Sequence, residues 1–261
     1  MEIQIKKAIK AGNSSAVILP RSWLNEKVRV ELLRKTPDVI LYDVIDIIKN
    51  YIDLKDVVGI YLTGSYARGE EDETSDLDIL VITNDLDKEM ISKGICNILI
   101  VSEELLRQKI EKDLFPIGQM IREARPLLNS SYLKNIDVRV TKRNVKWYLD
   151  TTEDKLKIIK EVIERSKKSG YLSDLVAYTL VLRIKTLHII GGLVRKRDYS
   201  KRDFVELIKR ISKGASAYER YLSVKNNMGD KKGIKVEEAE RLYDYLEKQL
   251  KEVKEIIRRL H

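Results

Sequence analysis

The chain has 261 residues, of which 43% are hydrophobic, enough for one large core or for two to three small ones. Its formal charge of +9 points weakly to a polyanionic partner such as nucleic acid or nucleotide, although a solvated basic surface would give the same sum. One cysteine excludes an intramolecular disulfide, the N-terminus is too polar for a signal peptide, and Arg183 and Lys185 interrupt the most apolar stretch, 177–194. We therefore expect a cytoplasmic protein without membrane contact. Its isoleucine, lysine and glutamate content is weakly typical of an archaeal or thermophilic source.

Two short strands are predicted at the N-terminus, over 2–8 and 16–19, because both segments are β-rich and the turn-forming cluster AGNSS separates them. Pro20 ends the second strand, and a short helix could follow over 22–28. A piece of this size, residues 1–34, is too small to bury a core of its own. We expect it to dock on the rest of the chain, to dimerise or to interleave with a second copy.

The next segment mixes helical and β patterns. Apolar residues recur at helical spacing over 39–52, and a capping signature at Ser102 opens another helix. Three apolar runs are predicted as strands: 57–62, 76–83 and 95–102. This order predicts a small mixed α/β sheet domain over residues 35–140.

From Thr141 onward the pattern is helical. An apolar stripe runs from Trp147 to Ile163, and further helices are predicted over 172–194, 204–211, 218–224 and 236–260. Glycines are the expected punctuation between helices: Gly170, Gly191, Gly192 and Gly229. The fold class is therefore α+β, with a hairpin module, a mixed sheet and an all-helical bundle of four to five helices over 141–261. The sheet segment is net acidic and lies between two net basic ends.

A pair of carboxylates marks the start of the second central strand. Asp76 and Asp78 are two residues apart, so on a strand both point to one face, while Leu77 points into the core. Two adjacent carboxylates repel each other unless a cation joins them. Mg²⁺ prefers carboxylates together with substrate phosphates, so the pair is a candidate magnesium site.

A glycine–serine turn follows the first central strand. Gly64 allows close backbone approach, and the N–H groups of the turn with the Ser65 hydroxyl could hold a triphosphate. Arg68 lies one turn further on and could take a phosphate oxygen. A phosphate clamp facing a metal pair is what a metal-assisted attack on an α-phosphate requires.

Gly64-Ser65, ten intervening residues and Asp76-x-Asp78 resemble the signature of the minimal nucleotidyltransferases of the DNA polymerase β superfamily. The resemblance covers roughly residues 38–105. It implies Mg²⁺-dependent transfer of an NMP from an NTP such as ATP to an acceptor hydroxyl, which could belong to RNA, a protein or a small molecule.

The family carries a third carboxylate on the next strand, where this chain has Asn97. Asparagine is a weaker Mg²⁺ ligand and cannot act as a general base. Asp137 could substitute if its segment pairs as a further strand, and Glu123 is another candidate. The alternative is a regulator or antitoxin whose transferase domain is degenerate.

Residues 1 to about 34 resemble the AbrB-type swapped-hairpin module, in which two copies interleave into a dimer that binds DNA. The resemblance rests on KAGNS, on VILPR and on the basic residues around them. It implies a homodimer that binds DNA or that only dimerises. The candidate DNA contacts are Lys6, Lys7, Lys10, Asn13 and Arg21.

Arg183-x4-His188 resembles the signature of HEPN helical bundles, whose nuclease members cleave RNA. The chain departs from the pattern, since Ile184 and Ile190 replace polar residues, and a core or interface histidine explains His188 equally well. Alternatively, the bundle closes over nucleotide and acceptor, and a basic loop after Gly192 contacts phosphates of RNA or nucleotide. The candidates there are Arg195, Lys196, Arg197, Lys201 and Arg202.

Overall fold

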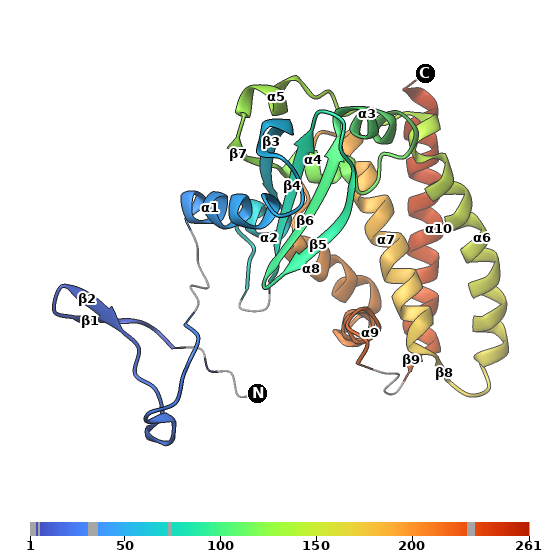
Figure 1. Ribbon diagram of the computed structural model, residues 1–261. Helices are drawn as coiled ribbons and strands as arrows, with labels where there is room; N and C mark the ends of the chain where they lie inside the picture. Colours follow the sequence, from blue (N-terminus) through green and yellow to red (C-terminus); the bar gives the residue numbers. More distant parts are fainter. Residues whose placement is uncertain (1–3, 5, 31–35, 73–74, 229–232, 261) are drawn as a thin grey trace. The chain divides into compact units, whose positions relative to one another are not determined.

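The computed structural model describes residues 4, 6–30, 36–72, 75–228 and 233–260. The chain divides into two compact units, Met1–Lys35 and Thr36–His261, which we describe separately. The fold class is α+β, as predicted: a small hairpin, a mixed five-stranded sheet and a helical region (Figure 1).

The first unit holds one hairpin, whose strands β1 (Ile9–Ala11) and β2 (Ser14–Ala16) pair antiparallel. Ala11 pairs with Ser14, which leaves a two-residue turn with Gly12 at φ 61°. The expected strand positions were wrong: the first strand starts later, and the second starts earlier and ends at Ala16. The reason is the turn, which is tighter than the cluster AGNSS suggested, so pairing begins directly beside it. Residues 2, 3 and 5 of the expected first strand lie outside the described residues.

A 3-10 helix, Arg21–Trp23, stands where a helix over 22–28 was considered. Several apolar side chains of this unit are exposed: Ile9, Ile18, Leu24, Val28 and Val30. Among the described residues, neither hairpin strand buries a side chain. The hairpin therefore has no core of its own, as its length predicted.

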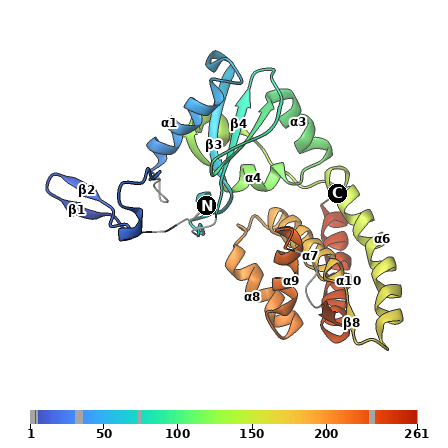
Figure 2. The same cartoon turned by 60° about the horizontal axis from the view of Figure 1, so that its bottom comes forward.

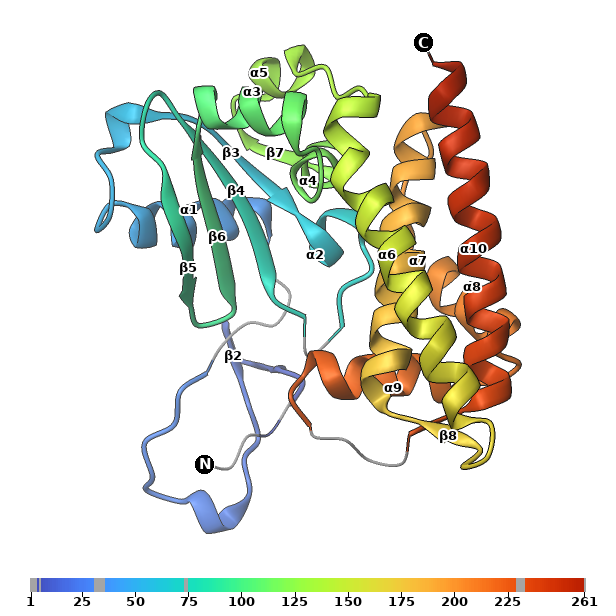
Figure 3. The same cartoon turned by 90° about the vertical axis from the view of Figure 1, so that its right-hand side faces the viewer.

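The second unit begins with α1 (Pro37–Ile48), which Thr36 caps through a hydrogen bond from the Val39 amide. Its buried face packs on one side of a sheet with strand order β5-β6-β4-β3-β7 (Figure 3). The strands are β3 (Val57–Thr63), β4 (Leu77–Thr83), β5 (Lys88–Lys93), β6 (Cys96–Ser102) and β7 (Arg125–Leu128). Only β4 and β6 pair in parallel among these described strands.

The opposite face of the sheet is covered by α3 (Glu103–Lys112) and α4 (Ile117–Glu123), with α5 (Ser130–Asn135) near the β7 edge. The Ser102 hydroxyl accepts a hydrogen bond from the Leu105 amide, which confirms the predicted cap of α3. The chain after α5 is not a strand, so the condition for Asp137 to join the sheet is not met.

The helical region consists of α6 (Lys142–Ser166), α7 (Asp174–Val194), α8 (Lys201–Ser212), α9 (Ser216–Lys225) and α10 (Val236–Arg259). Two short strands, β8 (Tyr171–Leu172) and β9 (Ile234–Lys235), pair at one end. Helix α7 packs against α6, α9 and α10 and also contacts α4 (Figure 2). It thereby joins the helical core to the sheet.

Two details of the predicted bundle were wrong. Gly191 and Gly192 lie inside α7, which continues to Val194, because the long apolar helix is stabilised by packing on several sides. Trp147 is 62% exposed and does not belong to the buried stripe of α6. The expected break at Gly229 lies outside the described residues.

Among the described helices, α7 alone is long and apolar enough to match a membrane span by length and composition. Half of its most apolar window is buried inside the helical core. Burial of this kind is usual for the central helix of a folded domain.

Candidate active site

The turn between β3 and α2 (Gly64–Arg68) is shaped by a glycine that no other residue can replace. Gly64 has φ +68°, and a Cβ atom at this position would lie 2.2 Å from Oδ2 of Asp78. The backbone of the turn is therefore in direct contact with one of the two predicted metal-binding carboxylates. Ser65 is the next residue, at the start of the short helix.

Asp78 lies on β4 opposite Thr63 of β3, and the Thr63 hydroxyl donates to the Asp78 carbonyl oxygen at 3.0 Å. Asp76 comes just before β4 and is exposed, while Leu77 between them is fully buried. Burial raises the pKa of Asp78, and the negative charges of Asp76 and Glu123 raise it further. The site thus brings carboxylates together with too little positive charge nearby to balance them. A bound cation would reduce the repulsion between them.

Asn97 on β6 is the parallel partner of Asp78, so the predicted third position does hold an asparagine beside the pair. Its Oδ1 accepts a hydrogen bond of 2.8 Å from the Ser92 hydroxyl on β5. This bond uses one of the two lone pairs of the amide oxygen.

Glu123, at the end of α4, lies directly on the turn. Its Oε1 accepts from the Gly64 amide at 2.8 Å, and its Oε2 accepts from Arg68 at 2.6 Å and from Gln119 at 2.8 Å. Its side chain is 8% exposed. Of the two suggested substitutes for the third carboxylate, the structure brings Glu123 to the site. Asp137 instead forms an ion pair with Arg139 and lines a depression beside α3 and α5.

Arg68 is held on both sides by carboxylates. Its Nε donates to Glu70 at 2.8 Å, and its Nη1 donates to Glu123 at 2.6 Å. Its guanidinium carbon lies 5.3 Å from the ring centre of Tyr199. These bonds engage two of the five N–H donors of the guanidinium, and both partners are carboxylates.

Two lysines of the helical region lie near the carboxylates, and neither was predicted from the sequence as a site residue. Lys185 of α7 has its Nζ 5.5 Å from the ring centre of Tyr199. Desolvation lowers its pKa to about 8, helped by the positive charges of Lys225 and Arg68. Lys225 of α9 is also close enough to Asp78 to lower the pKa of that carboxyl. The available signal for Lys185 was a lone charge inside an apolar helix, which we interpreted only as an interruption.

Arg183 and His188 are not brought together. Arg183 contacts α6, donating to the Thr151 hydroxyl at 2.9 Å with its guanidinium carbon 5.8 Å from the Trp147 ring centre. His188 packs against the rings of Tyr199 and Phe204. The two side chains lie on different faces of α7.

The basic loop begins after Val194 rather than after Gly192. Arg195, Lys196 and Arg197 are exposed in it, and the Lys196 carbonyl accepts from Arg122 of α4 at 2.9 Å. In the first unit the proposed DNA contacts are likewise exposed: Lys6, Lys7, Lys10, Asn13 and Arg21.

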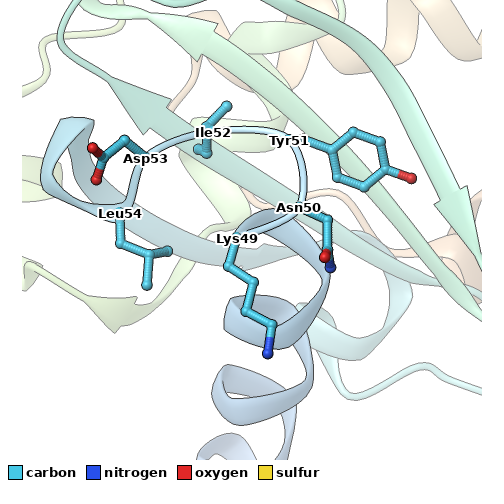
Figure 4. A pocket seen from close by; sticks show the side chains of 6 residues that line it. All are labelled: Lys49, Asn50, Tyr51, Ile52, Asp53 and Leu54. Carbon is cyan, nitrogen blue, oxygen red and sulfur yellow. The ribbon is translucent and has the colours of Figure 1, made fainter.

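One surface depression is lined by none of these site residues. It has a volume of about 560 Å³, is shallow and is lined by residues 49–54 in the loop after α1 (Figure 4). Its lining offers no cluster of catalytic groups. Within the described residues, no group of three or more His, Cys, Asp and Glu side chains is arranged to hold a metal ion.

Comparison with known proteins agrees with the motif. No curated protein matches the chain significantly. A nucleotidyltransferase-like protein from Exiguobacterium sibiricum is 14% identical, with 79% of this chain and 73% of that chain covered at a TM-score of 0.37. Spectinomycin adenyltransferase from Enterococcus faecialis, solved with ATP and spectinomycin, is 12% identical, with 80% and 99% covered at a TM-score of 0.39. The model of the nucleotidyltransferase domain matches residues 41–259, and because this match spans most of its length, the chain belongs to the nucleotidyltransferase domain family.

Proposed function

We propose that this protein is a Mg²⁺-dependent enzyme that transfers an NMP from an NTP to an acceptor hydroxyl. The observation that carries the proposal is the contact between the Gly64 turn and Asp78, because the turn that we propose to bind phosphate lies beside one of the two carboxylates. Family membership supports the reaction type and leaves the acceptor open: RNA, a protein side chain or a small molecule.

Asp76 and Asp78 would hold the cation, because their oxygens are the ligand type that Mg²⁺ prefers and their mutual repulsion favours a bound cation. A cation there would polarise the α-phosphate and lower the pKa of the acceptor hydroxyl. Gly64 and Ser65 would orient the phosphates through the turn. Lys185 and Lys225 would add positive charge where the pyrophosphate leaves.

The direct test is incubation with each α-labelled NTP and Mg²⁺, with total RNA or a cell lysate as acceptor. The Asp76→Ala/Asp78→Ala double variant is the matched control. We expect label on one acceptor class with the wild type and none with the variant. Equal labelling by both proteins would refute the assigned site.

A second candidate function is a DNA-binding regulator or antitoxin whose transferase domain has lost turnover. Asn97 favours it, because a carboxylate is missing where the family has one, and the exposed cations of the hairpin favour DNA contact. Salt-sensitive DNA binding without nucleotide, together with no labelling by any NTP, would support this function.

We propose three parts of the chain: residues 1–34 as an AbrB-like module, 35–140 as the transferase domain and 141–261 as a HEPN-like bundle that faces the substrate. We also propose that the AbrB-like module forms a homodimer and that the protein is cytoplasmic. Arg195, Lys196 and Arg197 are proposed contacts to RNA or nucleotide phosphates. We do not favour ribonuclease chemistry at Arg183 and His188, because these side chains face different neighbours.

A further inference from the structure

A continuous series of hydrogen bonds runs from the start of α8 to the catalytic turn. The Ser200 hydroxyl and the Lys201 amide donate to Glu70 at 2.8 and 2.9 Å. Glu70 accepts from Arg68, Arg68 donates to Glu123, and Glu123 accepts from the Gly64 amide. Ser200 and Gly64, which lie more than a hundred positions apart in the sequence, are thereby connected. The four polar side chains of the series are those of Ser200, Glu70, Arg68 and Glu123.

The middle of this series requires arginine. A guanidinium is planar and presents donors in a fixed fork, so Nε and Nη1 can serve two carboxylates at once. Arg68 is 16% exposed, Glu70 21% and Glu123 8%, so these ion pairs are shielded from solvent. Lysine has one charged nitrogen and cannot hold both carboxylates in the same geometry.

Each end of the series is attached to an element that the proposed reaction needs. Glu70 caps α8, whose preceding loop carries Tyr199, the ring that both Arg68 and Lys185 approach. Glu123 holds the amide of Gly64, the residue in contact with Asp78. The positions of the helical region and of the turn are therefore not independent.

We propose that Arg68 is a positioning residue rather than a phosphate ligand. With Glu70 and Glu123, it couples the position of the helical region to the geometry of the Gly64 turn. This assignment replaces the phosphate role expected from the motif and rests on the proposed function for its catalytic consequence. The coupling itself is a property of the protein without substrate.

The experiment compares Arg68→Lys with Arg68→Met in the full-length protein. A phosphate ligand is largely rescued by lysine, whereas a bridge between two carboxylates is not. We expect both variants to reduce kcat by at least about tenfold, the effect of losing a charge-assisted hydrogen bond. Both should leave the Kd of a non-hydrolysable NTP within about threefold of wild type, less than about 1 kcal/mol. Rescue by lysine, together with weakened NTP binding by Arg68→Met, would overturn the proposal.

Hydrogen exchange without nucleotide tests the coupling directly. Glu70→Gln changes only the side chain and keeps the backbone hydrogen bond from the Glu70 amide to Ser65, yet it should speed amide exchange in the peptide containing Gly64 as well as at the start of α8. The matched control is Asp72→Asn, which removes an exposed ion pair of 3.1 Å to Lys201 without affecting Arg68. The control should change exchange at α8 only. Unchanged exchange at Gly64 in Glu70→Gln, or the same change in both variants, would contradict the coupling.

These readouts separate the two proposals. If the wild type labels no acceptor, the proposed function fails, while the exchange data still decide the coupling. If labelling is normal and exchange at Gly64 does not respond to Glu70→Gln, only the coupling fails.

Discussion

Asp78 is the residue at which the proposed metal-binding role and the stability of the fold conflict. Its carboxylate is partly buried and lies near two other negative charges, and these factors raise its pKa in the folded state. A raised pKa means that the folded state prefers the protonated form, so stability from this group is present at low pH and is lost as pH rises through the folded pKa.

We therefore predict that Asp78→Asn stabilises the protein at neutral pH without Mg²⁺. An increase in Tm of about 2–4 °C corresponds to ~1 kcal/mol in a domain of this size. Calorimetry would measure it, with Asp76→Asn as the exposed comparison that should change Tm less. Added Mg²⁺ should raise the Tm of the wild type and not that of the variant. A lower Tm for Asp78→Asn without metal would contradict the electrostatic account.

Lys185 predicts a pH dependence for nucleotide binding. Its pKa of about 8 means that it loses its proton near that pH, and a neutral amine no longer attracts phosphate. The affinity for NTP should fall as pH rises through about 8, and binding near pH 8 should take up a proton. Titration calorimetry in buffers of different ionisation enthalpy would detect this uptake. Lys185→Met should abolish it, while Lys209→Met on the exposed side of α8 should not.

Asn97 allows a gain-of-function test. Asn97→Asp would place a third carboxylate in register with Asp78, which should tighten Mg²⁺ binding several-fold and lower stability in its absence. Metal titration followed by calorimetry would measure both effects. An unchanged Mg²⁺ affinity would indicate that Ser92 holds the new carboxylate at position 97 away from Asp78. Adding Ser92→Ala to the same variant should then tighten Mg²⁺ binding.

The sequence predicted the acidic pair, the turn and the asparagine at the third position, because short-range spacing defines them. It did not predict Tyr199, Lys185 or Lys225 as parts of the site, since their proximity arises only when helices pack beside the sheet. Glu70, two residues after Arg68, was given no role. Arg68 and Glu123 were both named from the sequence, but their contact was not predicted, so the role of Arg68 was assigned from the motif rather than from its two carboxylate partners.

Among the elements, the β3–α2 turn depends most strongly on one residue. Gly64→Ala would place a methyl group against Asp78 and force a left-handed conformation on alanine. We expect a loss of about 1–3 kcal/mol in the free energy of unfolding, the usual cost of such strain, and loss of labelling activity. Denaturant unfolding would measure the change in the free energy of unfolding. Gly69→Ala is the control, since its φ is also positive, at +72°, but nothing lies within 4 Å of its Cβ position.

Element prediction succeeded where apolar runs were long and failed where strands were short or polar. Strands β3, β4 and β6 were found because their buried residues form continuous runs. Strands β5 and β7 were missed: β5 carries three charged residues, and β7 contains a proline, so neither has the usual pattern. Both lie at sheet edges, where weak patterns are tolerated.

At the scale of the whole molecule, the division into two units predicts separable behaviour. A chain that starts at Thr36 should unfold with nearly the same midpoint as the full protein, because its cores lie entirely within that unit. It should be monomeric if the hairpin is the dimerisation element. Sedimentation and calorimetry on both forms would test this. A dimer of the shortened chain would place the interface elsewhere.

The residues of the candidate site extend along the chain from Gly64 to Lys225. During synthesis on the ribosome, the carboxylate pair and the turn emerge well before the two lysines that face them. A nascent chain released before α7 would carry the repelling acids without their counter-charges and without the surface that closes the site. Premature termination should therefore yield fragments that bind cations but transfer nothing, which confines activity to chains translated almost to the end.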